Sequence, residues 1–154
     1  TGVVDDSLHA HLGGYPGPLR DLVGVTVREW WPLPDAAAAP GASWERISAA
    51  VAPTPSRVAV TSPWGTLGAH LMIEDVAADA DPVAVFADGP LTGLPAIATQ
   101  AVGDGVTWYL ACRLDPESLG LVAQEIAMTA GVAPTTAHRA PGWRPSAAGT
   151  WCST

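Results

Sequence analysis

Side chains that could do chemistry are present in this chain, but few stand at a spacing that defines a site. Carboxylates occur at Glu29, Glu45, Glu74, Asp88 and Glu117, and nothing in the sequence pairs two of them across a cleft, as acid–base catalysis requires. The serine elbow G-x-S-x-G is absent as well. The sequence therefore indicates no catalytic residue.

Two histidines and a run of acidic residues raise the question of a metal. His9 and His11 would share one face of a strand, and such a pair could begin a metal site, but further ligands are not evident. The acidic residues between Glu74 and Asp81 lack the spacing of a calcium-binding loop. We therefore expect surface or interface histidines, a solvated acidic turn and no metal.

Neither the glycine-rich segment nor the cysteines point to a bound cofactor. The turn Gly-Gly-Tyr-Pro-Gly-Pro at 13–18 lacks both the dinucleotide spacing and the lysine of a phosphate-binding loop, and Pro18 removes a backbone donor. Cys112 and Cys152 have no metal-ligand spacing. We expect Cys112 to be a small core residue, with a disulfide to the tail as the alternative.

Composition limits the class of protein. The chain has 154 residues, enough for one domain with a core, and 48% of them are hydrophobic, yet no apolar run approaches the roughly 20 residues of a membrane span. It opens at Thr1 without a methionine or a recognisable secretory signal, so we expect a piece of a longer, cytoplasmic protein.

The charge pattern excludes two classes of partner. The net charge is −8, and all seven basic residues are scattered arginines. Nucleic acids and anionic membranes both require concentrated positive charge, so neither is expected as a partner. The seven tryptophans favour a core or a protein interface, while a sugar-stacking platform, as in a carbohydrate-binding module, remains the alternative.

The elements that would hold these side chains are best defined in the second half. Apolar runs at 83–87, 96–102 and 106–114 predict strands, the last two joined by a tight hairpin at Gly103-Asp104-Gly105. Asp115 is a natural N-cap for a following helix that Gly131 would end. Helical spacing predicts an apolar face made of Leu119, Val122, Ala123, Ile126, Ala127 and Ala130.

The first half is less regular. We expect 2–12 to be a strand end running into a loop, followed by a short helix from Pro18 to Gly24. Further strands are predicted at 25–31, 44–51 and 57–61, with a strand pair or an irregular strand at 64–76. The low-complexity segment 35–43 predicts a surface loop, and 133–154 a linker or tail.

Three motifs carry a resemblance to one family. They read TGVVDDSLHAHLGGYPGPLRDLVGV, VFADGPLTGLPAIATQ and GDGVTWYLACRLDPESL. Together they resemble the middle domain of the glycoside hydrolase family 42 β-galactosidases over residues 1–132. The resemblance implies an α/β fold with a mixed sheet in the layering of class I glutamine amidotransferases, similar to flavodoxin. Here that layering would be incomplete and rich in antiparallel strands, with a C-terminal amphipathic helix.

The resemblance also implies a function. The middle domain is a non-catalytic trimerisation domain, while a barrel upstream carries two catalytic glutamates and hydrolyses terminal β-galactosides; neither glutamate has a counterpart in this chain. We thus expect a homotrimer, contact with the barrel of the same parent chain and no cofactor. The alternatives are a carbohydrate-binding module and an amidotransferase-like hydrolase with a reactive Cys112.

The residues that we expect to form structural or intersubunit contacts lie in the motifs that carry the resemblance. They are Gly13, Gly14, Tyr15, Pro16, Gly17, Arg20, Asp88, Gly89, Trp108, Tyr109, Arg113 and Asp115.

Overall fold

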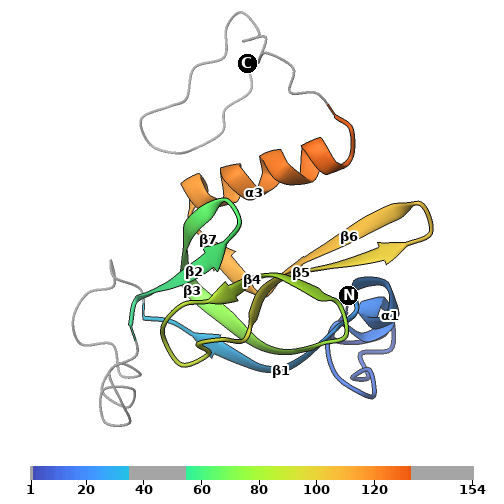
Figure 1. The fold of residues 1–154 in the computed structure, drawn as a ribbon. Coiled ribbons are helices and arrows are strands. Elements are labelled where there is room, and N and C mark those ends of the chain that lie inside the picture. The colour runs from blue at the N-terminus through green and yellow to red at the C-terminus, as the bar shows by residue number, and fades with distance from the viewer. Residues whose placement is uncertain (1, 35–54, 133–154) are drawn as a thin grey trace, which may run out of the picture.

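An antiparallel sheet dominates the part of the chain that the computed structural model describes, residues 2–34 and 55–132 (Figure 1). Its strands are β1 Val25–Pro32, β2 Arg57–Ser62, β3 Gly65–Ala78, β4 Asp81–Phe86, β5 Pro95–Val102, β6 Gly105–Leu110 and β7 Cys112–Leu114. The helices are the 3-10 turn η1 Gly17–Leu19, α1 Arg20–Val23 and α3 Pro116–Thr129. No helix among the described residues is long and apolar enough to cross a membrane.

The coarse fold prediction, an α/β chain rich in antiparallel strands, is confirmed. The predicted mixed sheet is not observed, because every strand pairing among residues 2–34 and 55–132 is antiparallel. The layering of a class I glutamine amidotransferase is not confirmed by these elements and stays a prediction. The expectations for 35–43, 44–51 and 133–154 lie outside the described residues.

The hydrogen-bonded sheet closes on itself. β2 pairs with β3 and β4, β5 pairs with β4 and β6, and β7 returns to pair with β3. The junction is Ala111, whose N–H donates to the Ala96 carbonyl (2.9 Å) while its carbonyl accepts from the Glu74 N–H (2.8 Å). The predicted single strand at 106–114 is therefore wrong: the segment changes partner from β5 to β3 at Ala111.

β3 is the longest strand and pairs with β1 and β2 in addition to β7. Its first half pairs with β2 and its second half with β1. Between the halves Leu71 has a φ of 64°, and its carbonyl accepts from the Leu33 N–H at 2.8 Å. Of the two possibilities predicted for 64–76, the irregular strand is the one observed.

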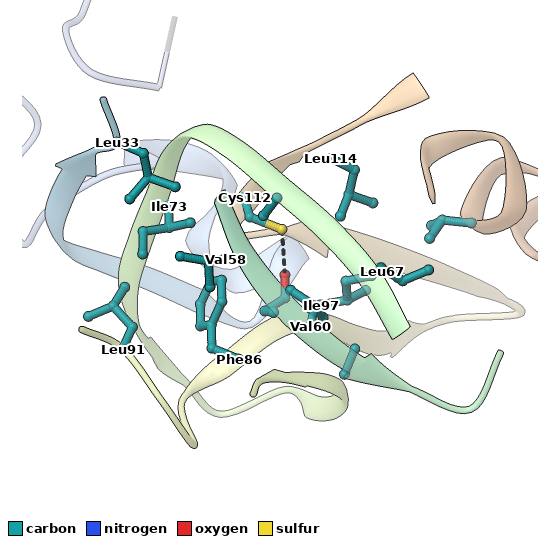
Figure 2. Packing of buried hydrophobic residues seen from close by; sticks show 14 residues of the cluster. Leu33, Val58, Val60, Leu67, Ile73, Phe86, Leu91, Ile97, Cys112 and Leu114 are labelled. Carbon is teal, nitrogen blue, oxygen red and sulfur yellow. Dashed lines mark hydrogen bonds between the residues drawn. The ribbon is translucent and has the colours of Figure 1, made fainter. Parts of the chain in front are cut away.

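The buried apolar residues form two clusters. The larger is enclosed by the closed part of the sheet, as Figure 2 shows. Its members come from β2, β3, β4, β5, β7 and α3, with Leu33 and Leu91 from the connecting segments. The smaller contains Val25, Val27, Val76, Ala98 and Ala111 with neighbouring residues, and the N-terminal turn and α1 pack against it. Cys112 belongs to the larger cluster, as predicted.

Helix α3 begins and ends as the sequence predicts, but its buried face is narrower. Asp115 caps it, with its side chain accepting from the Ser118 N–H, and Gly131 follows its end with a φ of 69°. Only Val122 and, in part, Ile126 reach the larger cluster. The prediction that Leu119, Ala123 and Ala130 belong to the buried face is wrong. All three are exposed, because only a narrow strip of the helix contacts the sheet.

The N-terminal segment is also less regular than predicted. Residues 2–12 form a loop with a single bridge between Val4 and Ala10. The Asp5 carboxylate accepts from the N–H groups of Ser7 and His9 at 2.8 and 2.9 Å, and this local turn replaces a strand. His9 and His11 therefore do not share a strand face. The helix predicted from Pro18 to Gly24 is confirmed as η1 followed by α1.

Candidate assembly surface

The turn at Gly13–Arg20 is held together by the arginine at its end. The Arg20 guanidinium donates to the carbonyl of Leu12 at 2.8 Å and to that of Gly17 at 3.0 Å. Gly13 has a φ of 87°, and a Cβ there would collide with the same guanidinium. Arg20 thus fixes the shape of the turn from within, which leaves the leucines of the segment to face outward.

Tyr15 joins this turn to the edge of the sheet. Its carbonyl accepts from the Val27 N–H at 2.7 Å, and its ring meets Trp30 edge-on with 5.7 Å between centroids. The Trp30 indole in turn donates to Glu74 at 3.1 Å. Pro16, which follows in a cis peptide, is buried, and Gly14 and Gly17 complete the turn with positive φ.

Glu74 is the centre of a polar cluster that the sequence did not reveal. It accepts from Trp30 and, through its other oxygen, from the Tyr109 hydroxyl at 2.5 Å. Burial, and then the bond to Glu74, raises the pKa of Tyr109 far above its usual range. Glu74 lies in β3, and the neighbouring Asp75 pairs with Arg28 at 2.6 Å. The solvated acidic turn expected here is therefore wrong for these two residues, because both lie in a strand.

Asp115 brings a second set of residues together. Besides capping α3, its carboxylate forms an ion pair with Arg57 of β2, and its N–H donates to the Gly68 carbonyl of β3 at 2.9 Å. The Ser118 hydroxyl accepts from the Gly68 N–H at 2.9 Å. The Ser118 N–H, followed by the Ser118 side chain and the Arg57 charge, holds the pKa of Asp115 below its usual range. These contacts fasten α3 to the sheet.

The remaining predicted residues are spread over separate places. The Asp88 carboxylate accepts from the Ala59 N–H at 2.7 Å, and Gly89 follows it in the turn after β4. Trp108 packs on Trp64, with 6.2 Å between centroids. Arg113 of β7 is exposed. The predicted residues thus form several structural contacts rather than one cluster.

None of these contacts has the arrangement of a catalytic or metal centre. Among residues 2–34 and 55–132, no three His, Cys, Asp or Glu side chains stand close enough to hold a metal ion. Burial raises the pKa of the Cys112 thiol to about 12, which suppresses the thiolate that an amidotransferase-like nucleophile would need. Trp31, Trp64 and Trp108 pack against the core, as most tryptophans of a small domain do.

The exposed apolar side chains are what sequence reasoning missed. Leu12, Leu19 and Leu22 are exposed around α1, and Leu119, Leu121 and Met128 are exposed on α3. A surface rich in large apolar side chains is typical of a protein interface. The sequence did carry one sign of the exposed apolar surface on α3: the helix has few charged residues, only Glu117 and Glu125 between 116 and 129.

Comparison with known proteins identifies the family of this chain. The model of the β-galactosidase trimerisation domain family matches residues 1–133. A β-galactosidase from an Arthrobacter species is 33% identical over 130 residues, which are 84% of this chain and 16% of that enzyme. The β-galactosidase BglY of Alicyclobacillus acidocaldarius is 36% identical over 137 residues, 86% of this chain and 18% of the enzyme.

Solved structures show the same fold. The β-galactosidase from Bacillus circulans sp. alkalophilus matches with a TM-score of 0.68 at 21% identity, over 87% of this chain and 18% of its own. The enzyme from the Antarctic haloarchaeon Halorubrum lacusprofundi matches with a TM-score of 0.66 at 28% identity, over 86% of this chain and 17% of its own. The chain thus spans about one sixth of the length of its curated relatives. It belongs to the β-galactosidase trimerisation domain family.

Proposed function

We propose that this chain holds three copies of a β-galactosidase together and takes no part in bond cleavage itself. The observation that carries the proposal is the match of the trimerisation domain model to residues 1–133, which make up most of this chain. Hydrolysis of terminal β-galactosides would belong to an upstream barrel of the parent protein, with which this domain would also be in contact.

The structure supports an assembly function in three ways. The turn at Gly13–Arg20 and the start of α3 are fastened by hydrogen bonds, so the surfaces that they present are preorganised and lose little entropy on association. Large apolar side chains are exposed on both. The polar side chains inside, such as Glu74 and Tyr109, bond to one another rather than pointing into a cleft.

Several finer points belong to the same proposal. We take residues 1–132 as the assembly domain and 133–154 as a linker toward a further domain of the parent. The parent's whole middle domain would have the amidotransferase-like layering, of which this chain forms the antiparallel part, and the parent would act in the cytoplasm. The predicted contact residues, from Gly13 to Asp115, would act by shaping the association surfaces.

The mass of the chain in solution tests this proposal. We expect size-exclusion chromatography with light scattering to give three times the 15.7 kDa of one chain, unchanged over a hundredfold range of concentration, because a closed ring leaves no surface for further growth. A mass of 15.7 kDa across that range would contradict the proposal that this chain carries assembly by itself.

A further inference from the structure

We propose that Asp104 is a site of spontaneous covalent modification, at which aspartate converts to isoaspartate through a cyclic imide formed with Gly105. Such a modification does not depend on the proposed trimer. Aspartate followed by glycine is the pair most prone to this reaction, because glycine has no side chain to obstruct ring closure. The chain contains two such pairs, Asp88-Gly89 and Asp104-Gly105, and the structure distinguishes them.

The reaction takes all its atoms from the two residues and from water. The Gly105 backbone nitrogen bonds to Cγ of the Asp104 carboxylic acid, and water leaves with the acid hydroxyl and the amide hydrogen. Water then adds to either carbonyl of the succinimide ring and breaks the adjoining C–N bond. Opening at the main-chain carbonyl yields isoaspartate, whereas opening at the side-chain carbonyl restores aspartate. The mass is unchanged, and no oxidant is needed.

Asp104 lies at the tip of the β5–β6 hairpin. Gly103 and Asp104 form the turn between the paired residues Val102 and Gly105, and every residue from 101 to 106 is exposed. Figure 1 shows this hairpin reaching beyond the rest of the sheet. A Cβ placed on Gly103 would meet no atom of the described chain within 4 Å, apart from its chain neighbours. The Asp104 side chain therefore has room to turn toward the Gly105 nitrogen.

Little holds the reacting atoms of this pair in place. The Asp104 carboxylate accepts a hydrogen bond from no group among residues 2–34 and 55–132. Gly105 pairs with Val102 at the last step of the hairpin ladder, so opening of a single pair frees its nitrogen. The end of a hairpin opens at a much lower free energy than the fold as a whole.

The other pair is also exposed, but it is held on both sides. The Asp88 carboxylate accepts from the Ala59 N–H at 2.7 Å. The Gly89 carbonyl accepts from the Thr92 hydroxyl at 2.7 Å, and a Cβ on Gly89 would lie 2.9 Å from Val58. Ring closure at Asp88 would break the bond to Ala59 and rotate a peptide that the rest of the turn fixes.

Isomerisation at Asp104 would change the hairpin turn and leave the base of the hairpin attached. Isoaspartate adds a methylene carbon to the main chain, and a two-residue turn has a fixed geometry that the longer backbone does not fit. Nearer the base, the Gln100 side chain donates to the Asp21 carbonyl and the Thr107 hydroxyl to the Leu22 carbonyl, both at 2.8 Å. These bonds tie the hairpin to α1 and confine the change to the tip.

Peptide mapping of aged protein tests the proposal. The folded chain is kept in mildly acidic buffer, which supplies uncharged carboxylic acid, and isoaspartate at both sites is quantified by mass spectrometry with electron-transfer fragmentation. We expect isoaspartate to accumulate roughly tenfold faster at Asp104 than at Asp88, the factor that one hydrogen bond to a charged group is worth. In concentrated urea the two rates should converge, because the contacts of Asp88 are lost.

Two variants separate the imide route from other damage. Asp104→Glu retains the charge but would have to close a larger ring, so no isomer is expected there. Gly105→Ala places a methyl group beside the attacking nitrogen and should slow the reaction several-fold. The fold tolerates this methyl group, because Gly105 has no positive φ and its Cβ would lie 3.6 Å from the nearest atom, the Val102 carbonyl oxygen. The rate at Asp88 should be unchanged in both variants.

Three results would overturn the proposal. They are equal rates at Asp104 and Asp88 in the folded chain, isoaspartate that forms at Asp104 only in urea, and a Gly105→Ala variant, folded by circular dichroism, that isomerises as fast as the wild type. All three are read from covalent structure, whereas the proposed trimer is tested by the mass of the chain in solution, so either can fail without the other.

Discussion

At the scale of single residues, Asp115 makes the most consequential contacts. It caps α3, pairs with Arg57 and bonds through its backbone to Gly68, so one residue connects a helix to two strands. The helix cap that Asp115 forms and the negative charge that it carries contribute to stability with different dependence on pH. The Ser118 N–H, then the Ser118 side chain and the Arg57 charge, lower the pKa of Asp115. Its charge therefore stabilises the fold above the unfolded pKa of about 4, and this contribution is lost as the pH falls through the lower folded value.

Two substitutions at Asp115 should separate these contributions. At neutral pH we expect Asp115→Ala to lower the free energy of unfolding by about 1 kcal/mol, because the cap is lost, and Asp115→Asn to lower it by less, because asparagine also caps. Urea denaturation at several pH values checks this. The advantage of the wild type over Asp115→Asn should decline as the pH falls below about 4 and vanish below the folded pKa of Asp115, while that of Asp115→Asn over Asp115→Ala should persist. An advantage of aspartate over asparagine that grows on acidification would contradict the charge assignment.

The sequence predicted the capping role of Asp115 but not its partner. Capping is a local relation between neighbours, so residue types at fixed spacing reveal it. Arg57 lies 58 positions away, and Glu74 and Tyr109 are separated by 35, so only the pairing of strands brings each pair together. The exposure of Leu12 and Leu19 was missed for a related reason: burial depends on what packs above a side chain.

At the scale of elements, the turn after β4 shows how a local conformation is fixed by a distant strand. Asp88 accepts from the Ala59 N–H of β2, and Gly89, with a φ of 78°, lies against Val58. Gly93 in the same loop has a φ of 84° but has no neighbour within 4 Å of its missing Cβ. The two glycines therefore have the same backbone requirement and different surroundings.

Alanine at these two positions should separate backbone strain from steric contact. We expect Gly93→Ala to lower the free energy of unfolding by about 1–2 kcal/mol, because of the left-handed backbone alone. Gly89→Ala should lower it by at least about 1 kcal/mol more, because its Cβ would lie 2.9 Å from Val58 Cγ2, which is fully buried. Urea denaturation of both at equal protein concentration gives the comparison. Equal losses would mean that Val58 moves aside.

The sequence indicated most elements but not where one strand changes partner. β1, β2, β4, β5, the hairpin and α3 were predicted because alternation, turn residues and caps are local features. The run at 106–114 alternates without interruption, so its division at Ala111 left no trace in the pattern. The spacing of apolar residues likewise overestimated the buried face of α3. It shows which side of the helix is apolar, but not how much of that side the sheet covers.

At the scale of the whole molecule, closure of the sheet determines which parts can open independently. The Ala111 N–H donates to Ala96 of β5, and the Glu74 N–H of β3 donates to Ala111. The first is freed only when the β5 side of the junction opens, and the second only when the β3 side opens. The loop at 2–12, by contrast, is held by Asp5 and one isolated bridge.

Amide hydrogen exchange should reflect this difference. We expect the N–H groups of Ala111 and Glu74 to exchange roughly a hundredfold or more slowly than those of Asp5 and Leu8, because their exchange requires the closed sheet to open. Exchange followed by NMR gives these rates residue by residue. Similar rates at the junction and in the N-terminal loop would show that the closure opens locally.

The same closure determines when the domain can be finished during synthesis. β3 is complete at Ala78, but the strand that seals it, β7, ends at Leu114, and α3 follows only after that. Chains leave the ribosome from the N-terminus, and pairings between distant segments form slowly. A growing chain that has not yet reached Leu114 must therefore leave one edge of β3 open, so the nascent protein is most exposed to mispairing with its neighbours just before this short strand emerges.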